Sequence, residues 1–261
     1  MLFHGLTGAP SELWPLGLGL AAAGYRVEAP LWPGHGTSPE DLARRSADEL
    51  IRTARRFTED PEIAAIGGLS MGALLALIAA AGRPRTRALI LMAPALRLRG
   101  KNHLFVELMR LPGVAHLPLM MPKGGTGPKA ARISEPSLGG DRLEEAAARA
   151  AEGAIGSDEV DGRYDRIPFR WGRELFKLQR LAAAAAPQVT CPVLLLHGLR
   201  DGTASPGSAQ EIARLVRGSV SARFFPDSEH VLTLGPDRGA VAAEVARFLA
   251  TVVPRDQHLS A

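Results

Sequence analysis

A serine between glycines is the first feature of this chain that suggests nucleophilic chemistry. The pentapeptide GLSMG at residues 68–72 follows an apolar stretch at 63–67 and precedes an apolar helix predicted from about Met71. In such a strand–turn–helix the serine occupies a strained turn, and the glycines let strand and helix approach closely. The alternative is a glycine-rich turn without chemistry. Ser70 is therefore a candidate nucleophile that needs partners.

A serine hydroxyl reacts only when a base takes its proton, and the base must itself be held by a third group. Two later strands each end in a loop with a suitable residue: Asp201 follows the apolar run 193–196, and His230 follows a strand predicted at 222–225. Parallel strands end at one edge of a sheet. The sequence thus predicts Ser70 as nucleophile, His230 as general base and Asp201 as the residue that orients it.

Each partner has a competing interpretation. Asp201 precedes Gly202 and could serve only to stabilise a turn, and His230 could be an ordinary loop histidine. Asp227 is a rival carboxylate, but it stands three residues before His230 and would have to fold back on its own loop. The chain order Ser, Asp, His and the placement of each residue after a strand favour the catalytic interpretation.

Acyl transfer also needs two donors for the developing oxyanion. We assign them to the backbone N–H groups of Met71, which follows the nucleophile, and of Leu6, in the loop after a short strand at 1–3. Three other histidines, His4, His35 and His197, flank glycines and are interpreted as residues that order backbone. No His and carboxylate set has metal-ligand spacing on one helix face, so we predict no metal.

Strands and helices alternate along the chain, which predicts an α/β fold with a mostly parallel sheet flanked by helices. Further strands are expected at 25–29 and 88–92, and helices at 11–23, 46–58, 70–81, 171–186, 208–216 and 238–250. The alternation breaks between about 97 and 187. We therefore predict a core formed by residues 1–96 and 188–261 and a predominantly helical cap inserted at 97–187.

The cap should cover the site with an apolar inner face. The expected substrate contacts are large apolar residues from its first part: Phe105, Leu108, Met109, Leu119 and Met120. Long unbranched side chains such as methionine adapt to varied shapes, which favours broad tolerance of acyl chains.

Composition excludes several other classes of protein. The net charge is +4, but the 31 basic residues are mostly scattered arginines without interleaved aromatics, so no nucleic-acid partner is expected. No apolar run approaches the ~20 residues of a transmembrane helix. The single cysteine, Cys191, excludes an internal disulfide framework, and no secretory signal is visible, so we predict a cytoplasmic protein. The oligomeric state stays open.

Taken together, several segments resemble the bacterial carboxylesterase and monoacylglycerol-lipase group of the α/β-hydrolase superfamily. They are HGLTGAP (4–10), PGHG (33–36), GLSMG (68–72), TCPVLLLHGLRDGTASP (190–206) and SEHVLTL (228–234). The resemblance implies an α/β-hydrolase fold with a cap, no cofactor, and hydrolysis of small-molecule carboxylic esters with short to medium acyl chains. It places the triad on Ser70, Asp201 and His230. An amidase or peptidase, a thioesterase, a perhydrolase and a non-catalytic binding protein are alternatives on this fold.

Two features depart from these relatives. They typically carry some 20 or more residues of strand sequence before the HG motif, whereas His4 follows Met1 by three positions. We therefore expect N-terminal edge strands to be missing from this chain. Glu229 stands where relatives commonly have glycine; its carboxylate either raises the pKa of His230 or points to solvent, and we favour solvent.

Overall fold

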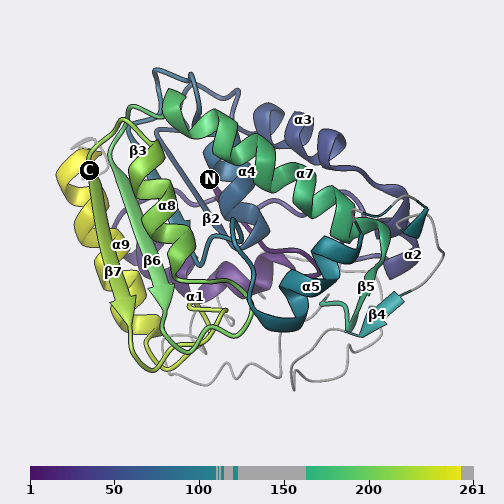
Figure 1. Cartoon of the computed structure of the whole chain (residues 1–261). Helices are drawn as coiled ribbons and strands as arrows, with labels where there is room; N and C mark the ends of the chain where they lie inside the picture. Colours follow the sequence, from purple (N-terminus) through teal and green to yellow (C-terminus); the bar gives the residue numbers. More distant parts are fainter. Residues whose placement is uncertain (110, 112, 115–119, 123–162, 254–261) are drawn as a thin grey trace.

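The sheet at the centre of the molecule is parallel throughout. The computed structural model describes residues 1–109, 111, 113–114, 120–122 and 163–253. In this part of the chain one sheet has the strand order β1-β2-β3-β6-β7 (Figure 1). Its strands are β1 (Leu2–Phe3), β2 (Ala65–Leu69), β3 (Ala88–Met92), β6 (Val193–Gly198) and β7 (Val220–Phe225). The predicted α/β fold is confirmed.

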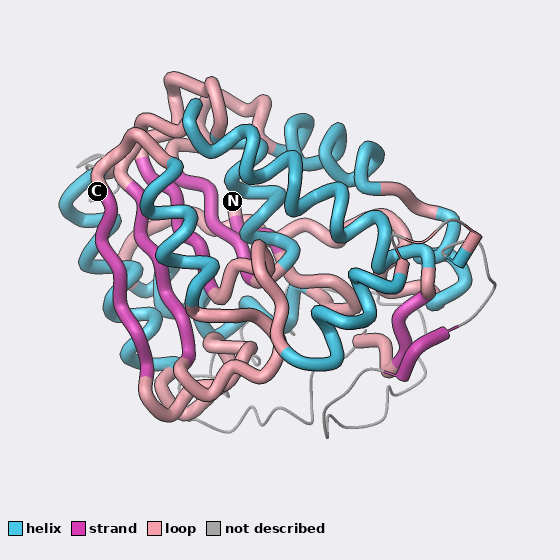
Figure 2. Tube along the Cα trace, in the orientation of Figure 1, coloured by secondary structure: helices cyan, strands magenta, loops and turns pink. Residues whose placement is uncertain are grey.

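Helices cover both faces of this sheet (Figures 1 and 2). One face carries α1 (Trp14–Ala22) and α9 (Arg238–Val252), and the other carries α3 (Ala47–Phe57), α4 (Met71–Ala80), α7 (Arg170–Ala185) and α8 (Gly207–Leu215). The remaining helical segments are η1 (Pro10–Leu13), α2 (Pro39–Arg44), α5 (Gly100–Leu108) and η4 (Ala186–Gln188). No helix in the described residues is long and apolar enough to cross a membrane.

Strand β3 is apolar on both faces because each face is covered by helices. In β3, Leu89 and Leu91 belong to the core beneath α4, whereas Ile90 and Met92 belong to the core beneath α1 and α9. Successive side chains of a strand point to opposite faces, so an unbroken apolar run is what a doubly covered strand requires. Helix α4 is buried along its whole length and carries the candidate nucleophile at its N-terminus.

Helix α7 connects the predicted cap to the core. Its residues Trp171 and Leu178 are fully buried, and the helix packs on α4 and α3. The Trp171 indole N–H donates to the Leu42 carbonyl at 2.7 Å. The described part of the 97–187 segment also holds α5 and an antiparallel pair, β4 (Met120–Pro122) and β5 (Arg166–Pro168). The cap boundaries and its helical content remain predictions, because residues 123–162 lie outside the described residues.

Three expected elements differ in the structure. Residues 25–29 are not a strand: β1 has only two residues, and the segment shares one hydrogen bond with it, from the Leu2 N–H to the Glu28 carbonyl at 2.7 Å. Strand β2 begins two residues later than expected, because Ile63 closes a turn with Asp60. Helix α1 begins at Trp14, three residues later than expected, because the 3₁₀ turn η1 precedes it.

Candidate active site

Ser70 occupies a strained turn between β2 and α4. Its backbone has φ 58° and ψ −116°, a conformation that residues other than glycine rarely adopt. The Ser70 N–H donates to the Met92 carbonyl of the neighbouring strand at 2.9 Å, which holds the turn in place. A Cβ at Gly68 would overlap the backbone of Gly72, and one at Gly72 would overlap the Phe3 carbonyl. The two glycines are therefore needed for this close packing.

We expect Gly72→Ala to lower the free energy of unfolding by about 2–3 kcal/mol, because backbone atoms of β1 must move to admit the methyl group. The matched control is Gly239→Ala in α9, where a Cβ would meet no described atom within 4 Å. That change should stabilise by up to about 1 kcal/mol through helix propensity. Urea titration of both variants measures the difference, and equal stabilities would contradict the packing argument.

The structure brings together the three residues predicted to form a triad. His230 Nε2 lies 2.8 Å from Ser70 Oγ, and His230 Nδ1 lies 2.8 Å from Asp201 Oδ2. A carboxylate can only accept, so Nδ1 carries the proton and Nε2 accepts from the serine hydroxyl. This is the tautomer in which a histidine can take the proton of a serine.

Asp201 is fully buried, and both of its carboxylate oxygens are used. Oδ1 accepts from the backbone N–H groups of Thr203 at 2.7 Å and Ala204 at 2.9 Å, and Oδ2 faces His230. Burial raises the pKa of this carboxyl, but hydrogen bonds from His197, His230 and the Ala204 N–H outweigh burial and hold the pKa well below its usual range. Asp201 is therefore a carboxylate at neutral pH.

The rival carboxylate lies elsewhere. Asp227 forms an exposed ion pair with Arg200, with 2.8 Å between its Oδ1 and Nη2 of the arginine. Glu229 is also exposed, at the rim of the cavity beside His230. Asp201 is therefore the carboxylate that contacts the imidazole, and Glu229 follows the solvent-facing alternative.

The sequence interpretation missed one contact of Asp201. His197, at the end of β6, is fully buried, and its Nε2 lies 3.2 Å from Asp201 Oδ2 and 3.3 Å from the Ala204 carbonyl. Both neighbours are acceptors, so Nε2 carries a proton. The spacing His-Gly-X-X-Asp across a tight turn was a signal that could have indicated this contact. His197 orders backbone as expected, and it also helps to fix the Asp201 carboxylate.

The expected oxyanion donors lie at the same cavity. Leu6 and Met71 both line it, next to Ser70. Neither backbone N–H donates a hydrogen bond to another described residue. Met71 is the first residue of α4, where the helix dipole favours negative charge. The Leu6 and Met71 N–H groups therefore remain the expected oxyanion donors.

The cavity over Ser70 has a volume of about 650 Å³. Its lining includes apolar side chains and an ion pair, in which Arg163 Nε lies 3.0 Å from Oε1 of buried Glu12. The apolar lining comes from the Leu6 loop, α5, α7 and their neighbours: Leu6, Leu98, Phe105, Val106, Ile167, Trp171 and Leu175. A cavity with both apolar and polar lining residues suits a small ligand that has a hydrocarbon part and a polar part.

Of the substrate contacts expected from the cap, we retain Phe105, which lines the cavity. Leu108 is 45% exposed, Met109 is buried against Gly172 of α7, and neither is among the cavity residues. Met120 is half-buried in β4 and is not among the cavity residues. Leu119 lies outside the described residues. The sequence could not indicate the contacts from α7, because the packing of that helix on the core depends on the tertiary structure.

His4 orders the backbone beneath the site, as expected. It is fully buried; its Nδ1 donates to the Gly5 carbonyl at 3.0 Å, and its Nε2 accepts from the Trp32 N–H at 3.2 Å. Burial, with the nearby His35, lowers its pKa from 6.5 to about 3. Between these pH values His4 is protonated in the unfolded chain but neutral in the folded chain, so stability falls as the pH falls.

We therefore expect the free energy of unfolding to decrease between pH 6.5 and 3, with His4 contributing up to ~1.4 kcal/mol per pH unit. His4→Gln should reduce the slope of the unfolding free energy against pH by an amount equivalent to about one bound proton. The same change at exposed His103 should leave the slope as it is. Urea titrations at several pH values measure the slopes. An unchanged slope in His4→Gln would show that His4 titrates normally.

Known proteins match this chain over most of its length. The family described as serine aminopeptidase, S33 (Hydrolase_4) matches residues 1–237. A thermostable monoacylglycerol lipase of Bacillus sp. (strain H-257) is 25% identical over 258 residues, which cover 96% of this chain and 89% of that protein.

Solved structures agree in fold. A structure from a study of two metagenome-derived lipolytic enzymes, LipS and LipT, superposes with a TM-score of 0.74 at 23% identity, covering 96% of this chain and 92% of that one. The monoacylglycerol lipase of Paleococcus ferrophilus gives 0.73 at 24% identity, covering 96% and 93%. With a parallel sheet, a serine on the turn after β2 and a family match across residues 1–237, the chain belongs to this family of α/β hydrolases.

Proposed function

We propose that this carboxylic ester hydrolase works through Ser70, His230 and Asp201, and that it cleaves esters of short to medium acyl chains, monoacylglycerols among them. The observation that carries the proposal is the chain of two 2.8 Å contacts from Ser70 Oγ through the imidazole to a buried carboxylate. A small-molecule ester as the substrate and a cytoplasmic location remain predictions.

In the proposed mechanism, Ser70 Oγ attacks the ester carbonyl while His230 Nε2 takes the hydroxyl proton. Asp201 stabilises the imidazolium that forms and holds its Nδ1–H. The tetrahedral oxyanion accepts hydrogen bonds from the N–H groups of Leu6 and Met71. His230 then protonates the departing alcohol, which leaves an acyl-enzyme. Water attacks that ester with His230 again as base, and Ser70 is regenerated.

The size and the lining of the cavity support the proposal that the acyl chain is of limited length. The apolar side chains of the lining offer hydrocarbon contacts, and the cavity volume of about 650 Å³ is within the range of sites for small molecules. Relatives that are named monoacylglycerol lipase or lipolytic enzyme point the same way. The Glu12–Arg163 pair adds charged groups to the lining, and these can solvate the alcohol part of an ester.

The test is hydrolysis of p-nitrophenyl esters over acyl lengths from two to sixteen carbons, with the matching p-nitroanilides and acyl thioesters in parallel. We expect a maximum of kcat/KM at short or medium esters, and labelling of Ser70 by a fluorophosphonate. Because the family is described as serine aminopeptidase, the anilides are the critical comparison. A higher kcat/KM for anilides than for esters would mean that the protein is an amidase rather than an esterase. Absence of both labelling and turnover would favour a binding protein.

A further inference from the structure

Thr7, in the loop expected to donate to the oxyanion, has an unusual backbone conformation. Its φ is 60°, in the left-handed region that is rare for β-branched residues. Thr7 is fully buried and directly follows Leu6, which lines the cavity. The Leu6–Thr7 peptide carries the Leu6 carbonyl and the Thr7 N–H, so contacts that hold Thr7 in this conformation also fix the C-terminal side of Leu6, whose own N–H lies in the preceding peptide.

The first of these contacts comes from His35. The Thr7 N–H donates to His35 Nε2 at 3.2 Å. His35 Nδ1 lies 3.4 Å from the Pro33 carbonyl, which can only accept, so Nδ1 carries the proton and Nε2 is the acceptor. The imidazole is almost fully buried. It thereby joins the PGHG segment at residues 33–36 to the Leu6 loop.

The second contact comes from Tyr164, in the predicted cap. The Tyr164 N–H donates to the Thr7 carbonyl at 2.9 Å. The Tyr164 hydroxyl donates to the Gly34 carbonyl at 3.0 Å and accepts from the Thr37 N–H at 2.8 Å. Its ring stacks on His35, with ring centroids 6.2 Å apart. One residue thus binds both the Leu6 loop and the PGHG segment.

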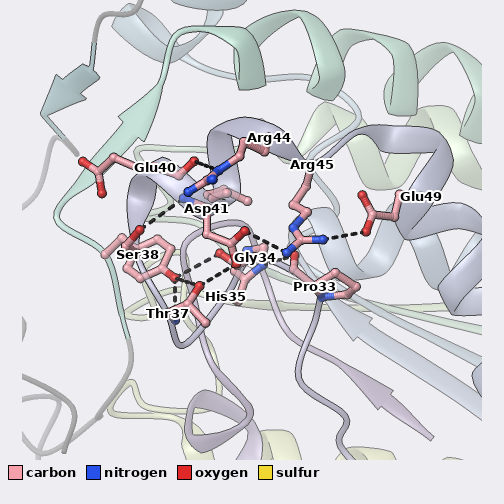
Figure 3. Close-up of polar contacts among 12 residues, drawn as sticks. Pro33, Gly34, His35, Thr37, Ser38, Glu40, Asp41, Arg44, Arg45 and Glu49 are labelled. Carbon is pink, nitrogen blue, oxygen red and sulfur yellow. Dashed lines mark hydrogen bonds and ion pairs between the residues drawn. The ribbon is translucent and has the colours of Figure 1, made fainter.

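Hydrogen bonds and ion pairs also connect the end of the PGHG segment to α2 and α3. Figure 3 shows Thr37 bound to Asp41, and Arg45 between Asp41 and Glu49. The Thr37 hydroxyl donates to Asp41 at 2.9 Å, and Arg45 contacts Asp41 at 2.7 Å and Glu49 at 3.1 Å. The support for His35 therefore continues into α2 and α3.

We propose that His35 and Tyr164 are positioning residues that hold Thr7 in its left-handed conformation and so aim the Leu6 N–H at the oxyanion. This inference rests on the proposed function. It also connects the cap to the rate of the chemical step, because Tyr164 belongs to the cap segment. Neither residue touches the reacting atoms.

The main experiment compares Tyr164→Phe with Tyr25→Phe, the same loss of a hydroxyl in a residue that lines a separate cavity beside Met1. We expect kcat for a p-nitrophenyl ester to fall roughly tenfold in Tyr164→Phe, less than the 10²–10³ of a lost oxyanion donor, with KM little changed. The Ki of an aryl boronic acid, which forms a tetrahedral adduct with the serine, should rise by the same factor. Tyr25→Phe should keep all three values.

A second experiment compares two substitutions of His35. His35→Gln keeps an acceptor near the position of Nε2 and should retain most of the activity, whereas His35→Ala should lose at least as much kcat as Tyr164→Phe. Thermal midpoints are measured for every variant. A lower midpoint with unchanged kcat and boronate Ki in the folded protein would mean a purely structural role and would overturn the proposal.

Labelling of wild-type Ser70 by a fluorophosphonate distinguishes failure of the positioning role from failure of the proposed function. An active, labelled wild type with full kcat in Tyr164→Phe and His35→Ala overturns the positioning role alone. A wild type that is neither labelled nor active overturns the proposed function, and the positioning role with it.

Discussion

Ser70→Ala is expected to reduce ester turnover by a factor on the order of 10⁶, because the attacking oxygen is removed and no described residue stands in its place. The fold should remain, since the Ser70 side chain makes one hydrogen bond, to His230, and such a bond contributes about 1 kcal/mol to stability. Turnover of the best p-nitrophenyl ester and the thermal midpoint measure the two effects.

The control is Ser46→Ala. Ser46 is the N-cap of α3, where its hydroxyl accepts from the Glu49 N–H, so its loss should cost about 1 kcal/mol of stability and no turnover. The two serines thereby separate chemistry from folding. If Ser70→Ala keeps more than about a thousandth of wild-type turnover, Ser70 is not the nucleophile.

Asp201→Asn is expected to lower kcat by about 10⁴. The backbone N–H groups of Thr203 and Ala204 both donate to Oδ1, so the asparagine oxygen should take that side. Its NH₂ group then faces His230 Nδ1. A donor facing a donor favours the tautomer with the proton on Nε2, and that imidazole cannot accept the proton of Ser70. Steady-state kinetics with the same ester give the magnitude.

Asp227→Asn provides the matched comparison. It makes the same chemical change at an exposed carboxylate that lines the cavity and pairs with Arg200. Exposed pairs contribute little, so stability and turnover should change little. A larger loss of activity in Asp227→Asn than in Asp201→Asn would exchange the roles of the two carboxylates.

The sequence by itself determined the class of fold and the residues at the ends of the strands. Apolar runs separated by helical segments predict a parallel sheet, since only strands covered on both faces lack polar residues. Ser70, Asp201 and His230 could be found because each follows a predicted strand, and parallel strands bring their carboxyl ends to one edge. Local sequence and chain order suffice for that inference.

Contacts between residues far apart in the chain required the tertiary structure. The 25–29 segment has the composition of a strand, but pairing depends on the length of β1, and β1 has two residues. Phe105 lies on α5 and Met109 directly follows that helix, and only the packing of α7 decides that Met109 is buried against Gly172 and that Phe105 lines the cavity.

The same holds for the surroundings of the site. The contact between His197 and Asp201 depends on the turn after β6, and the contacts of Thr7 with His35 and Tyr164 join segments 28 and 157 residues away. Periodicity indicates which side of an element is buried, but it does not indicate which distant side chain will meet it there. The sequence therefore supplied the reacting groups, and the packing of distant segments decided how they are held.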